Sequence, residues 1–116
     1  MTTRQERINE MLKIEISEII LRELRDPRLG FITITGAEVT KDLRHAKVFI
    51  SVMGDENQQK ETLMVLKKAS GFIRSEFGKR ATMKMIPEIS FRMDSGVQHG
   101  MRIFELLQQV KSDEQK

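Results

Sequence analysis

The chain has 116 residues, of which 39% are hydrophobic and 32% are charged, and its formal net charge is +3 at pH 7. These values are typical of one folded domain and exclude a long disordered chain, while the absence of cysteine excludes disulfides and thiolate metal sites. The chain contains no apolar run of about 18 residues, the length needed to span a membrane. Its polar N-terminal residues lack the apolar core of a signal peptide, so we expect a cytoplasmic protein.

An amphipathic helix is the first predicted element, and we expect it to start at Thr3. Thr3 and Glu6 have the spacing of a capping box, in which two side chains bond to free backbone amides of the first turn. Apolar residues then recur every three or four positions from Ile8 to Leu24, which indicates one buried face. Pro27 disfavours helical geometry in the residue before it, so the helix should end there and residues 25–30 should form a turn.

Two strands follow, and we predict that they form an antiparallel hairpin. Residues 31–40 are rich in β-branched side chains, and the apolar phase shifts by one position at Gly36, which indicates a β-bulge. After a polar turn at 41–44, a second strand alternates strictly and places one set of apolar residues on a single face: Ala46, Val48, Ile50 and Val52.

The second half predicts a long helix, a strand and a final helix. Asp55 is a predicted N-cap for the long helix, and Gly78 is its predicted end. Residues after Pro87 alternate as a third strand, which a right-handed crossover would make parallel to the second. Residues 97–110 read as a last helix and 111–116 as a short flexible tail, so we predict a single domain over residues 1–110.

Positive charge is concentrated in one short segment. Residues 67–87 hold six basic groups against Glu76 alone, a local charge of +5. The same segment contains a glycine inside a helical pattern, Gly71, which costs roughly 1 kcal/mol relative to alanine and so indicates a packing or functional reason. The local excess of positive charge predicts a phosphate-binding face. Its main candidate residues are Lys67, Lys68, Arg74, Lys79, Arg80 and Lys84. Further candidates on turns and outward strand positions are Lys41, Arg44, His45, Lys47 and Arg92.

Catalytic and metal-binding patterns do not occur in the sequence. His45 and His99 are far apart and match neither a zinc-site spacing nor a nucleophile motif. We therefore expect no enzymatic activity and no cofactor. The phenylalanines fall mostly at core phases, except Phe49 and Phe72, which argues against a platform for stacking single-stranded bases. The basic face is better suited to folded RNA, through its phosphates and shape.

Five short stretches, each modest alone, are specific in their order and spacing: 23–30, 42–48, 69–74, 86–91 and 100–103. Through these stretches, which are spread over nearly the whole chain, the sequence resembles the ribosome-binding factor A family. The resemblance implies an α+β fold, namely a KH-like domain of type II topology with a three-stranded mixed sheet. KH domains usually clamp the RNA backbone with a G-x-x-G loop, which this chain lacks. The family has an Ala-x-Gly kink instead, which Ala69-Ser70-Gly71 matches.

The kink implies that the long helix is two pieces, 57–70 and 71–79, and it adds Ser70 and Gly71 to the RNA-binding candidates. The family binds 16S rRNA in the immature small ribosomal subunit. It assists late maturation, including processing toward the mature 5′ end, and supports growth in the cold. Assembly GTPases are associated with its release, and it catalyses no reaction itself. The resemblance thus implies a non-catalytic small-subunit (30S) assembly factor, which we expect to be a monomer.

Two other functions stay open on the sequence alone. The chain could be a general KH-like RNA chaperone that acts on other RNAs, and would then show little preference for immature subunits. It could also be a protein-interaction adaptor whose basic face binds an acidic partner, and its affinity would then survive RNase treatment.

Overall fold

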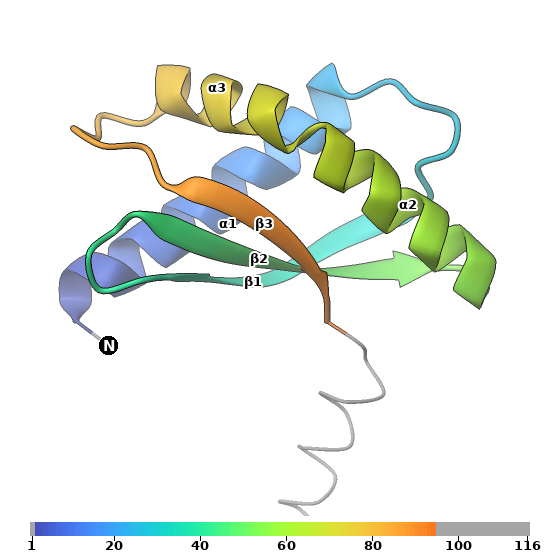
Figure 1. Cartoon of the computed structure of the whole chain (residues 1–116), viewed down its shortest axis with the longest axis horizontal. Coiled ribbons are helices and arrows are strands. Elements are labelled where there is room, and N and C mark those ends of the chain that lie inside the picture. Colours follow the sequence, from blue (N-terminus) through green and yellow to red (C-terminus); the bar gives the residue numbers. More distant parts are fainter. Residues whose placement is uncertain (1, 95–116) are drawn as a thin grey trace, which may run out of the picture.

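The computed structural model describes residues 2–94, which form three helices and three strands (Figure 1). The predicted order of elements is confirmed as far as the third strand. The predicted helix at 97–110, the tail at 111–116 and His99 lie outside the described residues. In chain order the elements are α1 (Thr3–Glu23), β1 (Phe31–Val39), β2 (His45–Met53), α2 (Glu56–Lys68), α3 (Ser70–Arg80) and β3 (Glu88–Met93).

The three strands form one mixed sheet in the order β1-β2-β3. β1 pairs with β2 in the antiparallel sense and β3 pairs with β2 in the parallel sense, which confirms both the predicted hairpin and the predicted crossover. The register of β1 shifts between Ile34 and Gly36, so the predicted bulge is confirmed with Thr35 as the extra residue.

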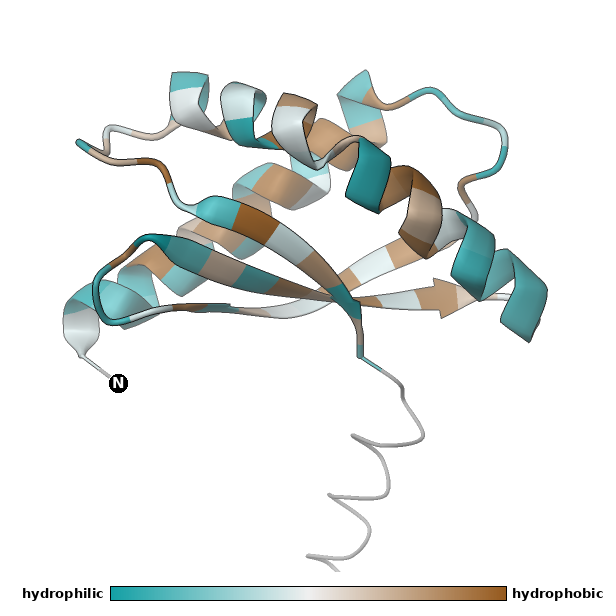
Figure 2. Ribbon diagram, in the orientation of Figure 1, coloured by the Kyte–Doolittle hydropathy of each residue, from teal (hydrophilic) through white to brown (hydrophobic). Residues whose placement is uncertain are grey.

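Within residues 2–94, the helices cover one face of this sheet and none covers the other, which we call the open face (Figure 1). Residues of β2 alternate between the buried face and the exposed face, and Figure 2 shows the same alternation in hydropathy along the strands. α1 packs on β1 and α3, while α2 and α3 pack on β3. The core between the two layers includes the fully buried side chains of Leu12, Ile16, Ile50, Ile73 and Phe77.

The ends of α1 differ from the prediction in detail. Its capping box is formed by Thr2 and Gln5, so the predicted Thr3–Glu6 pair is wrong. Thr2 Oγ1 accepts the Gln5 N–H at 3.1 Å, and Gln5 Oε1 accepts the Thr2 N–H at 3.1 Å. Thr2 has extended backbone and directly precedes the first helical residue, so it is the N-cap. The helix ends at Glu23, ahead of Pro27, because the backbone is already extended at Leu24.

Asp55 caps α2 as predicted, since its Oδ1 accepts the Gln58 N–H at 2.8 Å. The prediction that Gly78 ends the following helix is wrong, because α3 continues to Arg80. A Cβ at position 78 would lie 3.2 Å from Ile86. The small residue therefore lets the loop before β3 pack closely against α3. No helix within residues 2–94 is long and apolar enough to cross a membrane.

Candidate nucleic-acid interface

The break between α2 and α3 lies at Ala69, which is the C-cap of one helix and the N-cap of the next. Its backbone N–H donates to the Val65 carbonyl at 3.0 Å, and its carbonyl accepts the Ile73 N–H at 2.9 Å. The Ser70 hydroxyl donates to the Lys67 carbonyl at 2.8 Å. The predicted division into two helices is confirmed, with bounds one or two residues from those expected.

Gly71 lies in the first turn of α3 and does not create the break. A Cβ added at this position would meet nothing within 4 Å, and its φ lies outside the left-handed region. The backbone conformation therefore does not require glycine here. What the missing side chain provides is an open patch of helix surface beside exposed lysines.

Arg80 is directed toward α1. Its guanidinium lies 3.5 Å from Glu15, 3.3 Å from Glu18 and 3.9 Å from Glu23, and only 25% of its side chain is exposed. All three glutamates belong to α1, so Arg80 ties α3 to α1. Three carboxylates around one cation also leave little positive potential for an external phosphate.

Two more of the predicted cations on α3 have partners within the protein. The Lys79 ammonium lies 3.0 Å from Glu76 Oε1, although 70% of its side chain stays exposed. The Arg74 guanidinium donates to the Ile86 carbonyl at 2.8 Å and so holds the loop between α3 and β3. Both side chains therefore make contacts within the protein that their charge alone did not reveal.

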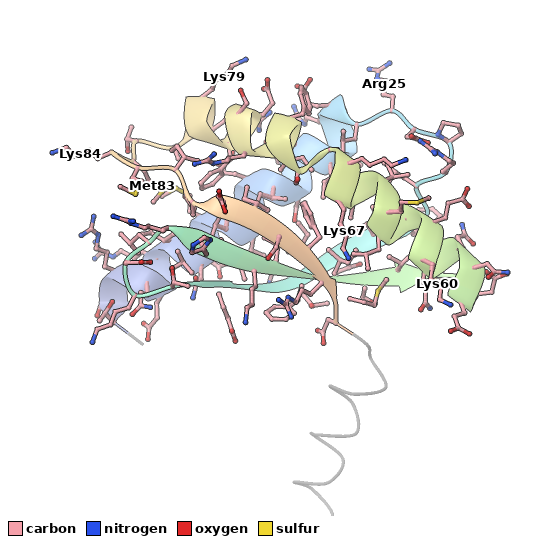
Figure 3. All side chains as sticks on the ribbon, in the orientation of Figure 1. Arg25, Lys60, Lys67, Lys79, Met83 and Lys84 are labelled. Carbon is pink, nitrogen blue, oxygen red and sulfur yellow. The ribbon has the colours of Figure 1, made fainter. Side chains whose placement is uncertain are left out.

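Within residues 2–94, the side chains of Lys67, Lys68 and Lys84 make no ion pair or hydrogen bond, and all three are exposed. Lys67 and Lys68 end α2 immediately before the break. In Figure 3, Lys79 points away from the sheet above α3, and Lys84 extends from the loop beyond it. We call Lys67, Lys68, Ser70 and Gly71 the junction surface.

The remaining predicted residues lie on the other layer. His45 and Lys47 are on the exposed face of β2, and Arg92 is on the exposed face of β3. Acidic groups accompany them: His45 Nδ1 lies 3.4 Å from Glu88, and Lys47 is directly opposite Glu38. The open face of the sheet is therefore close to neutral.

Lys41 and Arg44 lie in the turn between β1 and β2. This turn is ordered by Asp42, whose carboxylate accepts the Thr40 hydroxyl at 2.7 Å and the Arg44 N–H at 3.1 Å. These two bonds lower the pKa of the Asp42 carboxyl. The Arg44 carbonyl accepts the Glu88 N–H at 2.8 Å, so the turn meets the loop that carries Lys84 at one end of the molecule (Figure 1).

An apolar groove, which the sequence reasoning missed, lies at the other end of the sheet. It has a volume of about 870 Å³ and is lined by the end of α1, the start of β1 and the end of β2. The rim residues Leu21, Phe31 and Met53 are 80%, 83% and 75% exposed. Phe31 was expected in the core, but it starts β1 on the uncovered side, opposite Met53.

Catalytic groupings are not evident in the described part of the chain. Within residues 2–94, no cluster of three or more histidine and acidic side chains is placed to hold a metal ion. The features that do stand out are electrostatic and geometric: exposed lysines without partners next to a break between two helices.

Comparisons with known proteins identify the family. A family model described as Ribosome-binding factor A matches residues 4–107. A ribosome-binding factor A from Halothermothrix orenii is 55% identical over 112 residues, which cover 97% of this chain and 92% of that protein. One from Desulforamulus reducens is 47% identical over 116 residues, which cover 100% of this chain and 97% of that protein.

Solved structures show the same fold. The crystal structure of ribosome-binding factor A from Thermus thermophilus has a TM-score of 0.69 at 24% identity, and the match covers 77% of this chain and 94% of that one. A homology model of the Thermus thermophilus factor, fitted into the cryo-EM map of its complex with the 30S subunit, has a TM-score of 0.61 at 25% identity, with 72% and 88% coverage.

The predicted α+β, KH-like fold with a three-stranded mixed sheet is confirmed by the observed topology and by these structural neighbours. The family model spans most of the chain, and the relatives match it at up to 55% identity with nearly complete coverage. On this evidence, the chain belongs to the ribosome-binding factor A family.

Proposed function

We propose that this chain is an assembly factor of the small ribosomal subunit that binds 16S rRNA in immature particles through the junction surface. The proposal is supported by similarity to the Thermus thermophilus ribosome-binding factor A, a model of which has been fitted into a complex with the 30S subunit. The observation that carries it is the pair Lys67 and Lys68, which are exposed and unneutralised among the described residues and lie beside the break at Ala69.

Binding of this kind needs no catalytic group. Lysine ammonium groups that neutralise rRNA phosphates release condensed counterions, so affinity falls as salt rises. A factor that binds one rRNA conformation more tightly than another shifts the population toward it. Late maturation, including processing of the 16S 5′ end and its support of growth in the cold, would follow from that shift. The factor would act as a cytoplasmic monomer that an assembly GTPase releases.

The other predicted cations take different parts in this proposal. Lys79 and Lys84 extend the contact along α3 and the following loop. Arg74 and Arg80 position the surface, because one holds the loop before β3 and the other holds α1. The turn and sheet residues are secondary contacts: Lys41, Arg44, His45, Lys47 and Arg92.

The experiment is co-sedimentation of the protein with immature and mature small subunits across a salt series. The double variant Lys67→Gln/Lys68→Gln should bind immature subunits more weakly. The slope of log affinity against log salt should also flatten by about 2, one for each lost phosphate contact. The matched control is Arg4→Gln/Arg7→Gln, which removes the same net charge from two exposed residues of α1 that are not predicted contacts and should keep most of the affinity.

Three results would contradict the proposal. Equal losses in both double variants would indicate a diffuse charge effect rather than a localised surface. Binding to free RNAs without preference for immature subunits would indicate a general KH-like RNA chaperone. Affinity that survives RNase treatment of the target would indicate a protein-interaction adaptor.

A further inference from the structure

Phe72 is exposed beside the junction surface. The buried residues of α3 are Ile73 and Phe77, while Phe72 lies outside the core with 44% of its surface exposed. An isolated exposed apolar residue is common on protein surfaces. What distinguishes this ring is the set of residues around it.

Phe72 lies across the break from the junction lysines. It belongs to the first turn of α3 and follows Lys68 by four positions, and the Val65–Ala69 and Ala69–Ile73 backbone bonds keep a helical turn on each side of the break. A helical turn brings residues four apart near one another. Lys67, Lys68, Gly71 and Phe72 are all exposed, whereas Val65, Leu66 and Ile73 are buried. Gly71 presents no side chain next to the ring.

This combination has the chemistry of a nucleotide site. An ammonium group suits a phosphate, and an aromatic face suits a nucleobase, which stacks on it regardless of base identity. The two kinds of group lie about one helical turn apart in sequence, on either side of the break, so both can engage the same nucleotide, whose base and phosphate are joined through one sugar. The open surface over Gly71 leaves room for that sugar.

A protein partner fits this surface less well. The two exposed apolar side chains on this part of α2 and α3, Met64 and Phe72, are separated by Lys68 and do not form a continuous patch. The cores of protein interfaces are depleted in charged residues and rich in contiguous apolar area. The rim of the apolar groove at Leu21, Phe31 and Met53 is closer to that description.

We propose that the Phe72 ring stacks on an unpaired nucleobase of the RNA whose phosphates Lys67 and Lys68 contact. The inference rests on the proposed function and deepens it, because it names the recognised element as a single-stranded nucleotide within or next to folded rRNA. It also revises the expectation from sequence that the chain has no platform for stacking single-stranded bases.

The test uses the absence of tryptophan from the chain. Phe72→Trp introduces the sole indole, whose fluorescence should be quenched saturably by an unpaired oligoadenylate and far less by a blunt, fully paired RNA duplex of equal length. Phe31→Trp is the matched reporter, since Phe31 is more exposed and lies away from the junction surface. It should show no saturable quenching.

Binding to immature small subunits provides the second readout. Phe72→Leu keeps an apolar, helix-compatible side chain but removes the aromatic face, so affinity should fall about tenfold or more. The salt slope should stay unchanged, because no phosphate contact is lost. Phe31→Leu should bind like the parent protein, and circular dichroism of both variants should match it.

The outcomes separate this inference from the proposed function. If Phe72→Leu binds like the parent while Lys67→Gln/Lys68→Gln is weakened, stacking is overturned and the junction surface stands. If Phe72→Leu flattens the salt slope, the ring acts through the lysines and stacking is again overturned. If neither variant is weakened, the junction surface is not the RNA site and both proposals fail.

Discussion

Arg80 and Lys68 carry the same formal charge and lie in the same basic segment, but their surroundings give them different roles. Arg80 is mostly buried among three carboxylates, while Lys68 is exposed without a partner in the described structure. An exposed cation keeps its field and its hydrogen-bond donors available to an anion in solution. At the residue scale, exposure and pairing therefore select Lys67, Lys68 and Lys84 from the six cations of the segment, and position beside the break distinguishes the first two.

Gly71→Ala should raise the free energy of unfolding by about 0.5–1 kcal/mol. Alanine loses less backbone entropy in a helix than glycine, and its Cβ would meet no neighbour within 4 Å. Urea denaturation checks this value, and circular dichroism should show unchanged helix content because the break lies at Ala69. A loss of stability would show that the backbone needs glycine. A fall in subunit affinity at undiminished stability would place the RNA backbone against this position.

At the scale of elements, α3 is positioned from two sides. Arg80 joins its last turn to α1 through three glutamates, and Gly78 lets the loop before β3 pack closely. Arg74 adds a hydrogen bond to the Ile86 carbonyl of the same loop. The orientation of the junction surface relative to the sheet therefore depends on residues whose contacts are within the protein.

Arg80→Gln should lower the free energy of unfolding by about 1–2 kcal/mol, because it removes charge-assisted contacts and leaves three carboxylates of α1 close together. Lys79→Gln is the matched control on the same helix turn. It breaks one pair of a largely exposed side chain and should change stability by less than about 0.5 kcal/mol. Urea denaturation of both variants provides the comparison. Equal effects would show that the Arg80 pairs do not hold α3 on α1.

At the scale of the whole molecule, our proposal gives the main contact to the helical layer and secondary contacts to the sheet and its turn. The helical layer carries unneutralised lysines at the break, whereas the open sheet face has cations next to Glu38 and Glu88. Ordered turns flank β1 at both ends. In the turn before β1, the Arg28 guanidinium donates to Asp26 at 2.7 and 3.0 Å and lowers the pKa of that carboxyl to about 2.

This lowered pKa makes stability depend on pH in acid. The unfolded chain binds a proton at Asp26 near its ordinary pKa of 3.8, while the folded chain does so only near 2. The contribution of Asp26 to stability is therefore present above about pH 4 and is lost as pH falls toward 2.

Asp26→Asn should lower the urea midpoint at pH 5, and the difference between the midpoints of variant and parent should shrink by pH 2.5. The control Glu10→Gln, an exposed carboxylate of α1, should leave the pH profile unchanged. A difference that stays constant with pH would contradict the link to Asp26.

Much of this protein followed from local patterns in the sequence. Strict alternation from Ala46 to Val52 identified β2, and the phase shift at Gly36 identified the bulge, because the side-chain period of a strand registers a single inserted residue. The family resemblance identified the KH-like fold and a division of the long helix within 69–71, which the structure places at Ala69. Helix ends were less accurate: the capping box was misplaced by one residue, and Gly78 was taken as an end because glycine commonly follows helices.

Tertiary structure alone decided which residues share a surface and which neutralise one another. Glu15, Glu18 and Glu23 are more than 50 residues from Arg80 in the chain, so no local pattern could show that they surround it. Phe31, which the sequence placed at a core phase, is 83% exposed because the described elements around it leave its ring uncovered, whereas Phe72 was already out of phase with the core. The sequence by itself determined the elements, their order and the concentration of positive charge. Only the packing of α3 against α1 and the sheet decided which of those charges stay available, because charge is a property of a residue while potential depends on everything around it.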